Sequence, residues 1–322
     1  MAMTKPDLDA IISGAGSIAI SGHIRPDGDC VGSCLALQQY IRTWYPQKVC
    51  RVYLQTIPDT FGFLAGADEI VHEADDRRYD VFFALDLNDI GRLGEFGRIF
   101  SQAGHTVCVD HHIFHAAMAD ESYIIPESSS TCEVLCSLLD EEKITHEMAE
   151  ALYLGIAHDT GVFQYDCTHS STMRCAAMLM DKQIDHARIL EDTYFTKSWK
   201  QKQLLGRMLF ESIRLMDGRI AAGFMKKKDM VWYEAQSSDL DGFASELRTI
   251  KGVECAIFMY EVRSGEWKVS LRSSRQVDVD QIASLFGGGG HARAAGCMMS
   301  GQAFDVINAL TGQIALQLDG QS

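Results

Sequence analysis

The stretch SIAISGHIRPDGDCVGSCLALQQYIRTW, residues 17–44, decides how the chain folds. Its first six residues form a short run of apolar and β-branched side chains, which is typical of a buried strand. A turn containing Pro26 and Gly28 follows, and helical periodicity then extends over 30–44. A buried strand that leads directly into a helix is the repeating unit of an open parallel sheet.

The same alternation continues through the first half of the chain. Short buried strands are expected at 49–54, 81–86 and 106–110, and helical patterns at 130–141, 145–157 and 170–181. Strands that alternate with helices predict an α/β fold, a doubly wound and mostly parallel sheet with helices on both faces.

A second, smaller α/β unit is predicted further on. Its strands are expected at 219–225, 253–262 and 267–272, and its helices at 238–250, 278–286 and 303–317. Because 322 residues exceed what one hydrophobic core usually serves, two domains are expected. We predict an N-terminal domain over 1–188, a helical connector over 189–216 and a C-terminal domain over 217–322.

The net charge of −15 lies entirely in the first part of the chain. Residues 1–190 hold 13 basic and 28 acidic side chains, whereas 191–322 hold 16 of each. This distribution argues against a protein that binds long duplex nucleic acid, which would need a basic face. An anionic substrate would need cations on the acidic side, although a solvated acidic surface explains part of the excess.

Cellular location follows from what the sequence lacks. No apolar run approaches the roughly 18 residues that cross a bilayer, and the start shows no signal-peptide pattern. Ten cysteines occur without a CxxC pair. We therefore predict a cytoplasmic protein without a membrane partner, whose cysteines are reduced and buried rather than zinc ligands.

Acidic and histidine residues gather where the predicted strands end, which is where ligands bind in open α/β sheets. Taken singly, most of them are explained nearly as well by turns and helix caps. Their convergence at strand ends favours a metal centre instead. The candidate ligands are His23, Asp27, Asp29, Asp86, His111 and Asp159.

Oxygen and nitrogen donors without a thiolate favour Mn²⁺ or Mg²⁺. Two such ions about 3.5–4 Å apart can activate water and clamp a phosphoryl group for in-line attack. Neither a GxSxG elbow nor a GxxxxGK[ST] loop occurs, so acyl transfer and P-loop chemistry are not supported.

The ordered motifs H23-x3-D27-x-D29, D86, D110-H111-H112 and D159 resemble the DHH phosphoesterase superfamily. The later GGGGH followed by AAG resembles its associated substrate-binding domain. With no extra modules, the chain is most similar to the oligoribonuclease and pAp phosphatase branch, the nanoRNases. The resemblance therefore assigns catalysis to 1–188 and substrate binding to 217–322.

The resemblance also implies roles for individual residues. His23, Asp27 and Asp86 would hold one metal ion, and Asp29, Asp86, His111 and Asp159 the second, with two Mn²⁺ per chain and Mg²⁺ or Co²⁺ as substitutes. His112 would be the general acid, and Asp110 would orient a histidine by hydrogen bonding. The residues that would bind the substrate are Arg272, His291, Gly288, Gly289 and Gly290.

One residue departs from the family pattern, since His115 stands where the family often has asparagine. Ser129, Ser130 and Thr131 resemble a hydroxyl-rich stretch near the site, although helix capping explains them equally well.

The implied activity is Mn²⁺-dependent hydrolysis of very short RNA from the 5′ end and of pAp to AMP. A phosphodiesterase for cyclic di-AMP or linear pApA is the alternative. A longer-strand exonuclease, a family II pyrophosphatase and a catalytically silent nucleotide-binding regulator are less favoured. The expected partners are short single-stranded RNA or a mononucleotide bisphosphate, with a homodimer left open.

Overall fold

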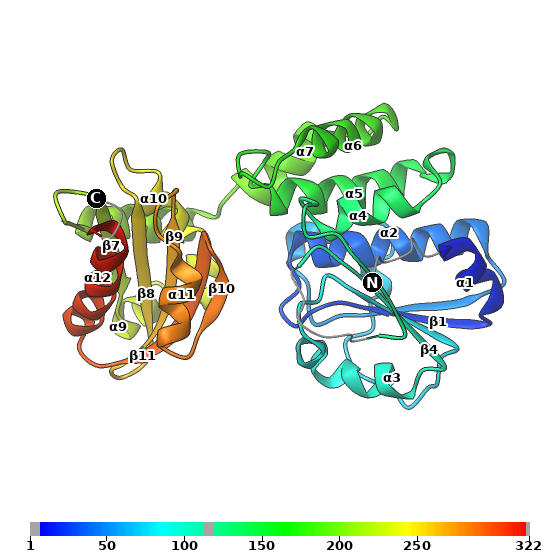
Figure 1. Ribbon diagram of the computed structural model, residues 1–322, viewed down its shortest axis with the longest axis horizontal. Helices are drawn as coiled ribbons and strands as arrows, with labels where there is room; N and C mark the ends of the chain where they lie inside the picture. Colours follow the sequence, from blue (N-terminus) through cyan, green and yellow to red (C-terminus); the bar gives the residue numbers. More distant parts are fainter. Residues whose placement is uncertain (1–6, 113–118, 320–322) are drawn as a thin grey trace. The chain divides into compact units, whose positions relative to one another are not determined.

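The computed structural model describes residues 7–112 and 119–319, apart from the side chain of His291. The chain forms two compact units, the first ending at Thr196 and the second beginning at Lys197 (Figure 1). His115 lies outside the described residues, so its effect on the site stays an open prediction.

The first unit is built on a parallel sheet. Its strand order is β2-β1-β3-β4-β5, and every neighbouring pair is parallel. This confirms the predicted mostly parallel α/β fold. The strands are β1 (Ser17–Ser21), β2 (Val49–Tyr53), β3 (Val81–Leu85), β4 (His105–Asp110) and β5 (Glu121–Ile124).

Alternate strand residues point to opposite sides of this sheet, so both of its faces carry apolar side chains. Helices cover both faces. Ile18 and Phe83 enter the larger core, whereas Ala19 and Phe82 enter the smaller one. Figure 1 shows α2 (Gly28–Trp44) on one side of the sheet and α3 (Gly97–Gln102) on the other. The remaining α-helices described in this unit are α1 (Leu8–Gly14), α4 (Thr131–Leu138), α5 (His146–Asp159), α6 (Ser170–Asp181) and α7 (His186–Leu190).

Short irregular helices connect these elements. They are η1 (Asp59–Phe61), η2 (Ala67–Glu69), η3 (Ile90–Phe96), η4 (Glu141–Lys143) and the π-helical turn η5 (Glu191–Phe195).

The second unit contains a mixed sheet of order β10-β11-β9-β8-β7-β6. The pair β7–β8 is parallel, and the other pairs are antiparallel. The strands are β6 (Ile213–Leu215), β7 (Ile220–Met225), β8 (Cys255–Arg263), β9 (Glu266–Ser273), β10 (Gly289–His291) and β11 (Ala294–Ser300).

Two hydrophobic cores lie on the two faces of this second sheet. Helices α11 (Val279–Leu285) and α12 (Ala303–Asp319) contribute to one core, and α8 (Trp199–Glu211) and α10 (Phe243–Arg248) to the other. Helix α9 (Lys227–Trp232) and the turn η6 (Ser237–Leu240) complete the described helices of this unit.

Helix α8 falls within the predicted connector, yet its residues Leu204 and Met208 are buried in a core of the second unit. The domain limits at 188 and 217 themselves stay predictions. Across the part of the chain that the structure describes, no helix has the length and apolar character needed to cross a membrane.

Candidate metal centre

The candidate ligands come together because three of their strands are neighbours. Strands β1, β3 and β4 are adjacent and parallel, so their carboxyl ends share one edge of the sheet. His23 comes two residues after β1, Asp86 directly after β3 and His111 directly after β4. Asp159 ends α5, which packs against α2.

The turn between β1 and α2 gives Asp27 two tasks. Its Oδ1 atom accepts hydrogen bonds from the backbone amides of Asp29 and Cys30, both at 3.2 Å, and so caps α2. Its Oδ2 atom lies 3.5 Å from Nε2 of His23. The helix-cap explanation and the metal-ligand prediction therefore apply to different oxygens of the same carboxylate.

Asp86 lies between the two imidazoles. Its Oδ2 atom is 3.4 Å from Nε2 of His23, and its Oδ1 atom is 3.8 Å from Nε2 of His111. The residue is buried and has a φ of 55°. A positive φ is uncommon for a non-glycine residue and is found often at functional sites. This geometry suits a carboxylate that bridges two cations.

Both imidazoles direct Nε2 toward carboxylates. Nδ1 of His23 lies 2.9 Å from the carbonyl oxygen of Ile24, and Nδ1 of His111 lies 3.3 Å from that of Ser128. Since a carbonyl only accepts, each Nδ1 carries a hydrogen, which leaves Nε2 as the atom that binds a metal ion once the ring is neutral. Nε2 of His111 is 3.1 Å from Oδ2 of Asp159.

Asp29 is buried and is held by the first turn of α4. Its Oδ2 atom accepts the backbone amide of Thr131 at 2.7 Å, and its Oδ1 atom accepts that of Cys132 at 2.9 Å. The hydroxyl of Thr131 also donates to Oδ1 of Asp86 at 3.3 Å. Ser130 is the cap of α4, so capping and contact with the site are both present in this segment.

Asp110 holds the loop after β4. Its Oδ1 atom accepts the backbone amides of His111 and His112 at 2.7 and 2.8 Å and Nδ1 of His112 at 2.7 Å. Its Oδ2 atom accepts the backbone amide of Leu87. With both oxygens engaged in this way, Asp110 fits an orienting role better than that of a ligand.

Negative charge governs the electrostatics of the centre. Burial and the neighbouring charge of Asp86 raise the pKa of Asp29 to about 7. Burial disfavours the charged form of His111, yet Asp159, Asp29 and Asp86 raise its pKa to about 10. Acids and imidazoles that both hold protons more tightly than usual indicate a surplus of negative charge, and cations would relieve it. The residues therefore fit divalent metal ions.

Among the residues that the structure describes, candidate donor atoms form three groups, and within each group every atom lies within 4.8 Å of the others. One of these donor residues, Cys30, was not predicted as a ligand from the sequence. The groups are Asp86, Asp110, His111 and His112; His23, Cys30 and Asp86; and Asp29, His111 and Asp159.

In the second unit, the predicted substrate-binding residues lie on neighbouring strands. Both Arg272 of β9 and His291 of β10 pair with Ala294 of the intervening strand β11. A Cβ atom at Gly288 or Gly290 would collide with the backbone of β11. These two glycines therefore permit close strand packing, an explanation that competes with their predicted role in substrate binding.

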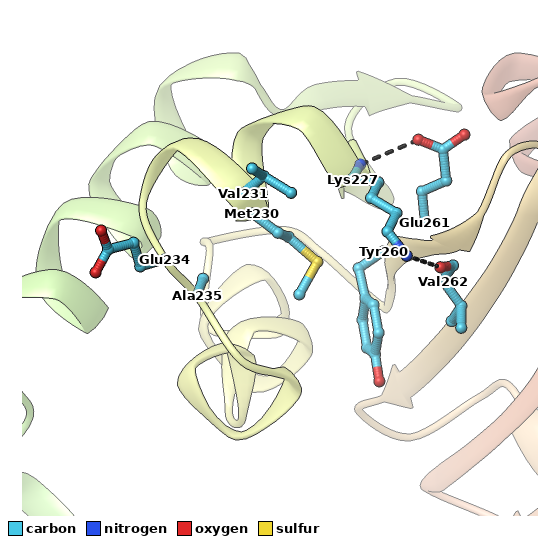
Figure 2. Close-up of a pocket in the computed structure, with 8 residues that line it drawn as sticks. All are labelled: Lys227, Met230, Val231, Glu234, Ala235, Tyr260, Glu261 and Val262. Carbon is cyan, nitrogen blue, oxygen red and sulfur yellow. Dashed lines mark hydrogen bonds between the residues drawn. The ribbon is translucent and has the colours of Figure 1, made fainter.

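A small cavity of about 280 Å³ lies elsewhere in this unit, between α9 and β8. Figure 2 shows the amide of Lys227 donating to Glu261 and its ammonium to the carbonyl of Val262. Met230 and Tyr260 also line the cavity, and no candidate ligand does. The cavity is thus separate from the predicted chemistry.

The fold and the centre define a two-unit α/β protein with a carboxylate and imidazole centre at the carboxyl edge of a parallel sheet. Residues 17–156 match the DHH family, N-terminal domain, and residues 229–315 match the DHHA1 domain. The chain therefore contains a DHH-family N-terminal domain and a DHHA1 domain, as its motifs predicted.

Relatives of known name agree with this assignment. The chain is 26% identical to the probable bifunctional oligoribonuclease and PAP phosphatase NrnA of Streptococcus mutans, over 87% of this chain and 88% of that protein. It is 25% identical to the NrnA of Bacillus subtilis, over 91% and 92%. A crystal structure of an exopolyphosphatase-related protein from Bacteroides fragilis has a TM-score of 0.88 at 26% identity, covering 98% and 97%. Family and relatives indicate a phosphoesterase hydrolase.

Proposed function

We propose that this protein is a Mn²⁺-dependent phosphoesterase that cleaves very short RNA from the 5′ end and hydrolyses pAp to AMP. The observation that carries the proposal is Asp86, whose two carboxylate oxygens face two different imidazoles, His23 and His111. The relatives named as oligoribonuclease and PAP phosphatase support the choice of substrates.

The proposed ligands fall into two sets that share Asp86. His23, Asp27 and Asp86 would hold one ion, and Asp29, Asp86, His111 and Asp159 the other. When bound, two such ions supply an activated water and neutralise the charge that develops on the phosphoryl group. The chain's own part is to fix these donors, through the carbonyl oxygens of Ile24 and Ser128 and the amides of α4.

His112 is proposed as the general acid. Burial opposes its charge, but the hydrogen bond that His112 donates to Asp110 and the charge of Asp86 raise the pKa of His112 above its ordinary value. A protonated imidazole whose Nδ1 is held by Asp110 presents its opposite nitrogen in a fixed direction. That nitrogen would protonate the leaving oxygen of the substrate.

Substrate length is proposed to be limited by the second unit. Arg272 is a half-buried cation on β9. It pairs with Ala294 of β11, which in turn pairs with His291 of β10. A guanidinium can bind a phosphate through two parallel hydrogen bonds. One such group suits a substrate of one or two nucleotides, and the balanced charge of residues 191–322 offers no excess of cations for longer strands.

A side-by-side assay tests the proposal. The purified chain, supplied with Mn²⁺, is given a 5′-phosphorylated dinucleotide, pAp, cyclic di-AMP and pyrophosphate. We expect the 5′-phosphorylated dinucleotide and pAp to be hydrolysed fastest. Turnover confined to cyclic di-AMP would replace the proposal with the dinucleotide-signal alternative, and turnover of pyrophosphate alone would overturn both.

Asp86→Ala tests the bridging assignment. Because it removes a donor from both proposed ion sites, we expect turnover of every substrate to be lost and Mn²⁺ binding to be weakened at both sites. Asp59→Ala, at the exposed η1 turn, is the control and should behave as the unmodified chain does. Substantial activity in Asp86→Ala would remove the bridging role.

A further inference from the structure

Glu133 lies in the first turn of α4 and is buried, with 8% of its surface exposed. Its Oε2 atom accepts the amide of Ser129 at 3.0 Å, the hydroxyl of Ser129 at 2.6 Å and the hydroxyl of Thr172 at 2.8 Å. Burial favours the neutral acid, yet these donors keep the pKa of Glu133 below its ordinary value. The side chain is therefore an ionised carboxylate that ties the start of α4 to α6.

The segment that Glu133 holds contacts three candidate metal ligands. The carbonyl of Ser128 accepts from Nδ1 of His111, the amide of Thr131 donates to Asp29, and the hydroxyl of Thr131 donates to Asp86. Ser129, between these contacts, has both its amide and its hydroxyl bound to Glu133. Glu133 contacts none of the proposed ligands directly in these bonds, but its partner lies between the residues that do.

We infer that Glu133 is a positioning residue of the metal centre: it fixes the segment 128–132 so that Asp29, Asp86 and His111 are held in the geometry that binds metal ions. This inference rests on the proposed function, since it assigns a purpose to ligands proposed there. A helix cap alone does not require it, because Ser130 already caps α4 by accepting the amide of Glu133 at 3.0 Å.

Thr172 provides a second, gentler way to disturb the same contact. It is fully buried in the first turn of α6 and donates its hydroxyl to Glu133. Thr172→Val removes the hydroxyl at nearly constant volume, whereas Thr172→Ser retains it. This pair separates the packing of residue 172 from the bonds of its hydroxyl, which also accepts the amide of His169 at 3.1 Å.

The experiment measures Mn²⁺ affinity on the full chain after removal of metal with a chelator, by following the electron paramagnetic resonance signal of the free ion. Loss of a residue that orients ligands weakens metal affinity by about 10–100-fold. We expect a weakening of that size for Glu133→Ala, less for Thr172→Val, and affinity near that of the unmodified chain for Thr172→Ser. Glu133→Gln keeps one oxygen for the three donors and should recover much of the affinity.

Glu150→Ala is the matched control, a half-buried acid on α5 that lies nine residues, or about 13.5 Å of helix, before Asp159. It should leave Mn²⁺ affinity unchanged. If Glu133→Ala does not fold, the Thr172 pair decides the question alone.

Melting temperatures of the metal-free variants separate positioning from simple stability. If Glu133→Ala and Thr172→Val melt earlier but bind Mn²⁺ as tightly as the unmodified chain, the role of Glu133 is only structural and the inference is wrong. If the unmodified chain binds no Mn²⁺, the proposed function fails and this inference fails with it. These two outcomes are distinguishable because the unmodified chain is measured first.

Discussion

Gly28 is the first residue of α2, and its replacement by alanine tests how tightly the centre is packed. A Cβ atom there would lie 2.6 Å from Cγ of His158 and 2.8 Å from its Cβ and Nδ1 atoms. Ordinary carbon contacts are about 3.5–4.0 Å, so a displacement of roughly 1 Å is required. The ring of His158 has little freedom, because Thr193 bonds its Nε2 at 2.9 Å and Phe61 and Tyr194 flank it.

The backbone must therefore move instead, either in the turn that carries Asp27 and Asp29 or at the end of α5, where Asp159 lies. Overpacking of this kind destabilises a protein by about 1–3 kcal/mol. For a unit of this size that corresponds to a melting temperature lower by roughly 2–12 °C. A misplacement of about 1 Å among reacting groups costs roughly 10²-fold in rate.

Thermal unfolding and steady-state hydrolysis of pAp measure the two effects for Gly28→Ala. In the background of His158→Gly the same change should cost much less, since both the colliding ring and the Cβ atom of residue 158 are absent. Gly206→Ala on α8, where an added Cβ has nothing within 4 Å, is the control and should not destabilise the chain. Equal losses from Gly28→Ala with and without the His158 ring would refute the steric explanation.

Asp110→Asn should lower kcat by about 10²–10⁴-fold, because a neutral amide no longer stabilises the protonated imidazole that acts as the general acid. A normal kcat would exclude His112 from that role. Arg272→Ala should raise KM for pAp more than Lys268→Ala, a change four residues earlier in β9, and equal KM values would remove Arg272 from substrate binding. Backbone amides and a hydroxyl at the start of β1 lower the pKa of Asp80, so its contribution to stability is present above its ordinary pKa and is lost as pH falls through the lowered value. Asp80→Asn should therefore be less stable than the unmodified chain at pH 7 but should lose less of its free energy of unfolding on acidification to about pH 3, as followed by circular dichroism. Equal losses of stability on acidification in the two proteins would contradict this.

The strands with strong apolar runs were predicted almost to the residue, since burial on both faces produces an unmistakable pattern. Strand β3 was predicted over 81–86 and ends at Leu85, because the positive φ of Asp86 turns the chain out of the sheet. Strand β5 was not predicted. It begins with Glu121 and Ser122 and is only partly buried at the sheet edge, so it lacks an apolar run.

In the second unit, Gly288, Gly289 and Gly290 were assigned to substrate binding and no strand was predicted there, whereas residues 289–291 form strand β10. Glycine has low intrinsic strand preference, and pairing with β11 overrides it. Strand β10 can therefore be recognised only from its pairing with β11 in the folded chain.

For the candidate site, the sequence indicated the residues but not their mutual support. Asp29 and Thr131 are 102 positions apart, and no local pattern reports a hydrogen bond between them. The periodicity of the sequence predicts where each strand ends, and the carboxyl ends of parallel strands meet at one edge of the sheet. The sequence could therefore predict that the candidate ligands lie near one another. The contribution of Glu133 could not be predicted, since a glutamate in the first turn of a helix is ordinary.

The wide separation of the proposed ligands along the chain also has a consequence for the stability of the folded protein. His23 and Asp159 stand at opposite ends of the first unit's ligand set, so an unfolded chain offers no ready-made chelate. Ions that bind only the folded form stabilise it by mass action, by about 2.7 kcal/mol at a hundred times the dissociation constant. If the proposed ions bind in this way, their scarcity would do more than slow the reaction: it would lower the free energy of unfolding and expose the chain to proteolysis.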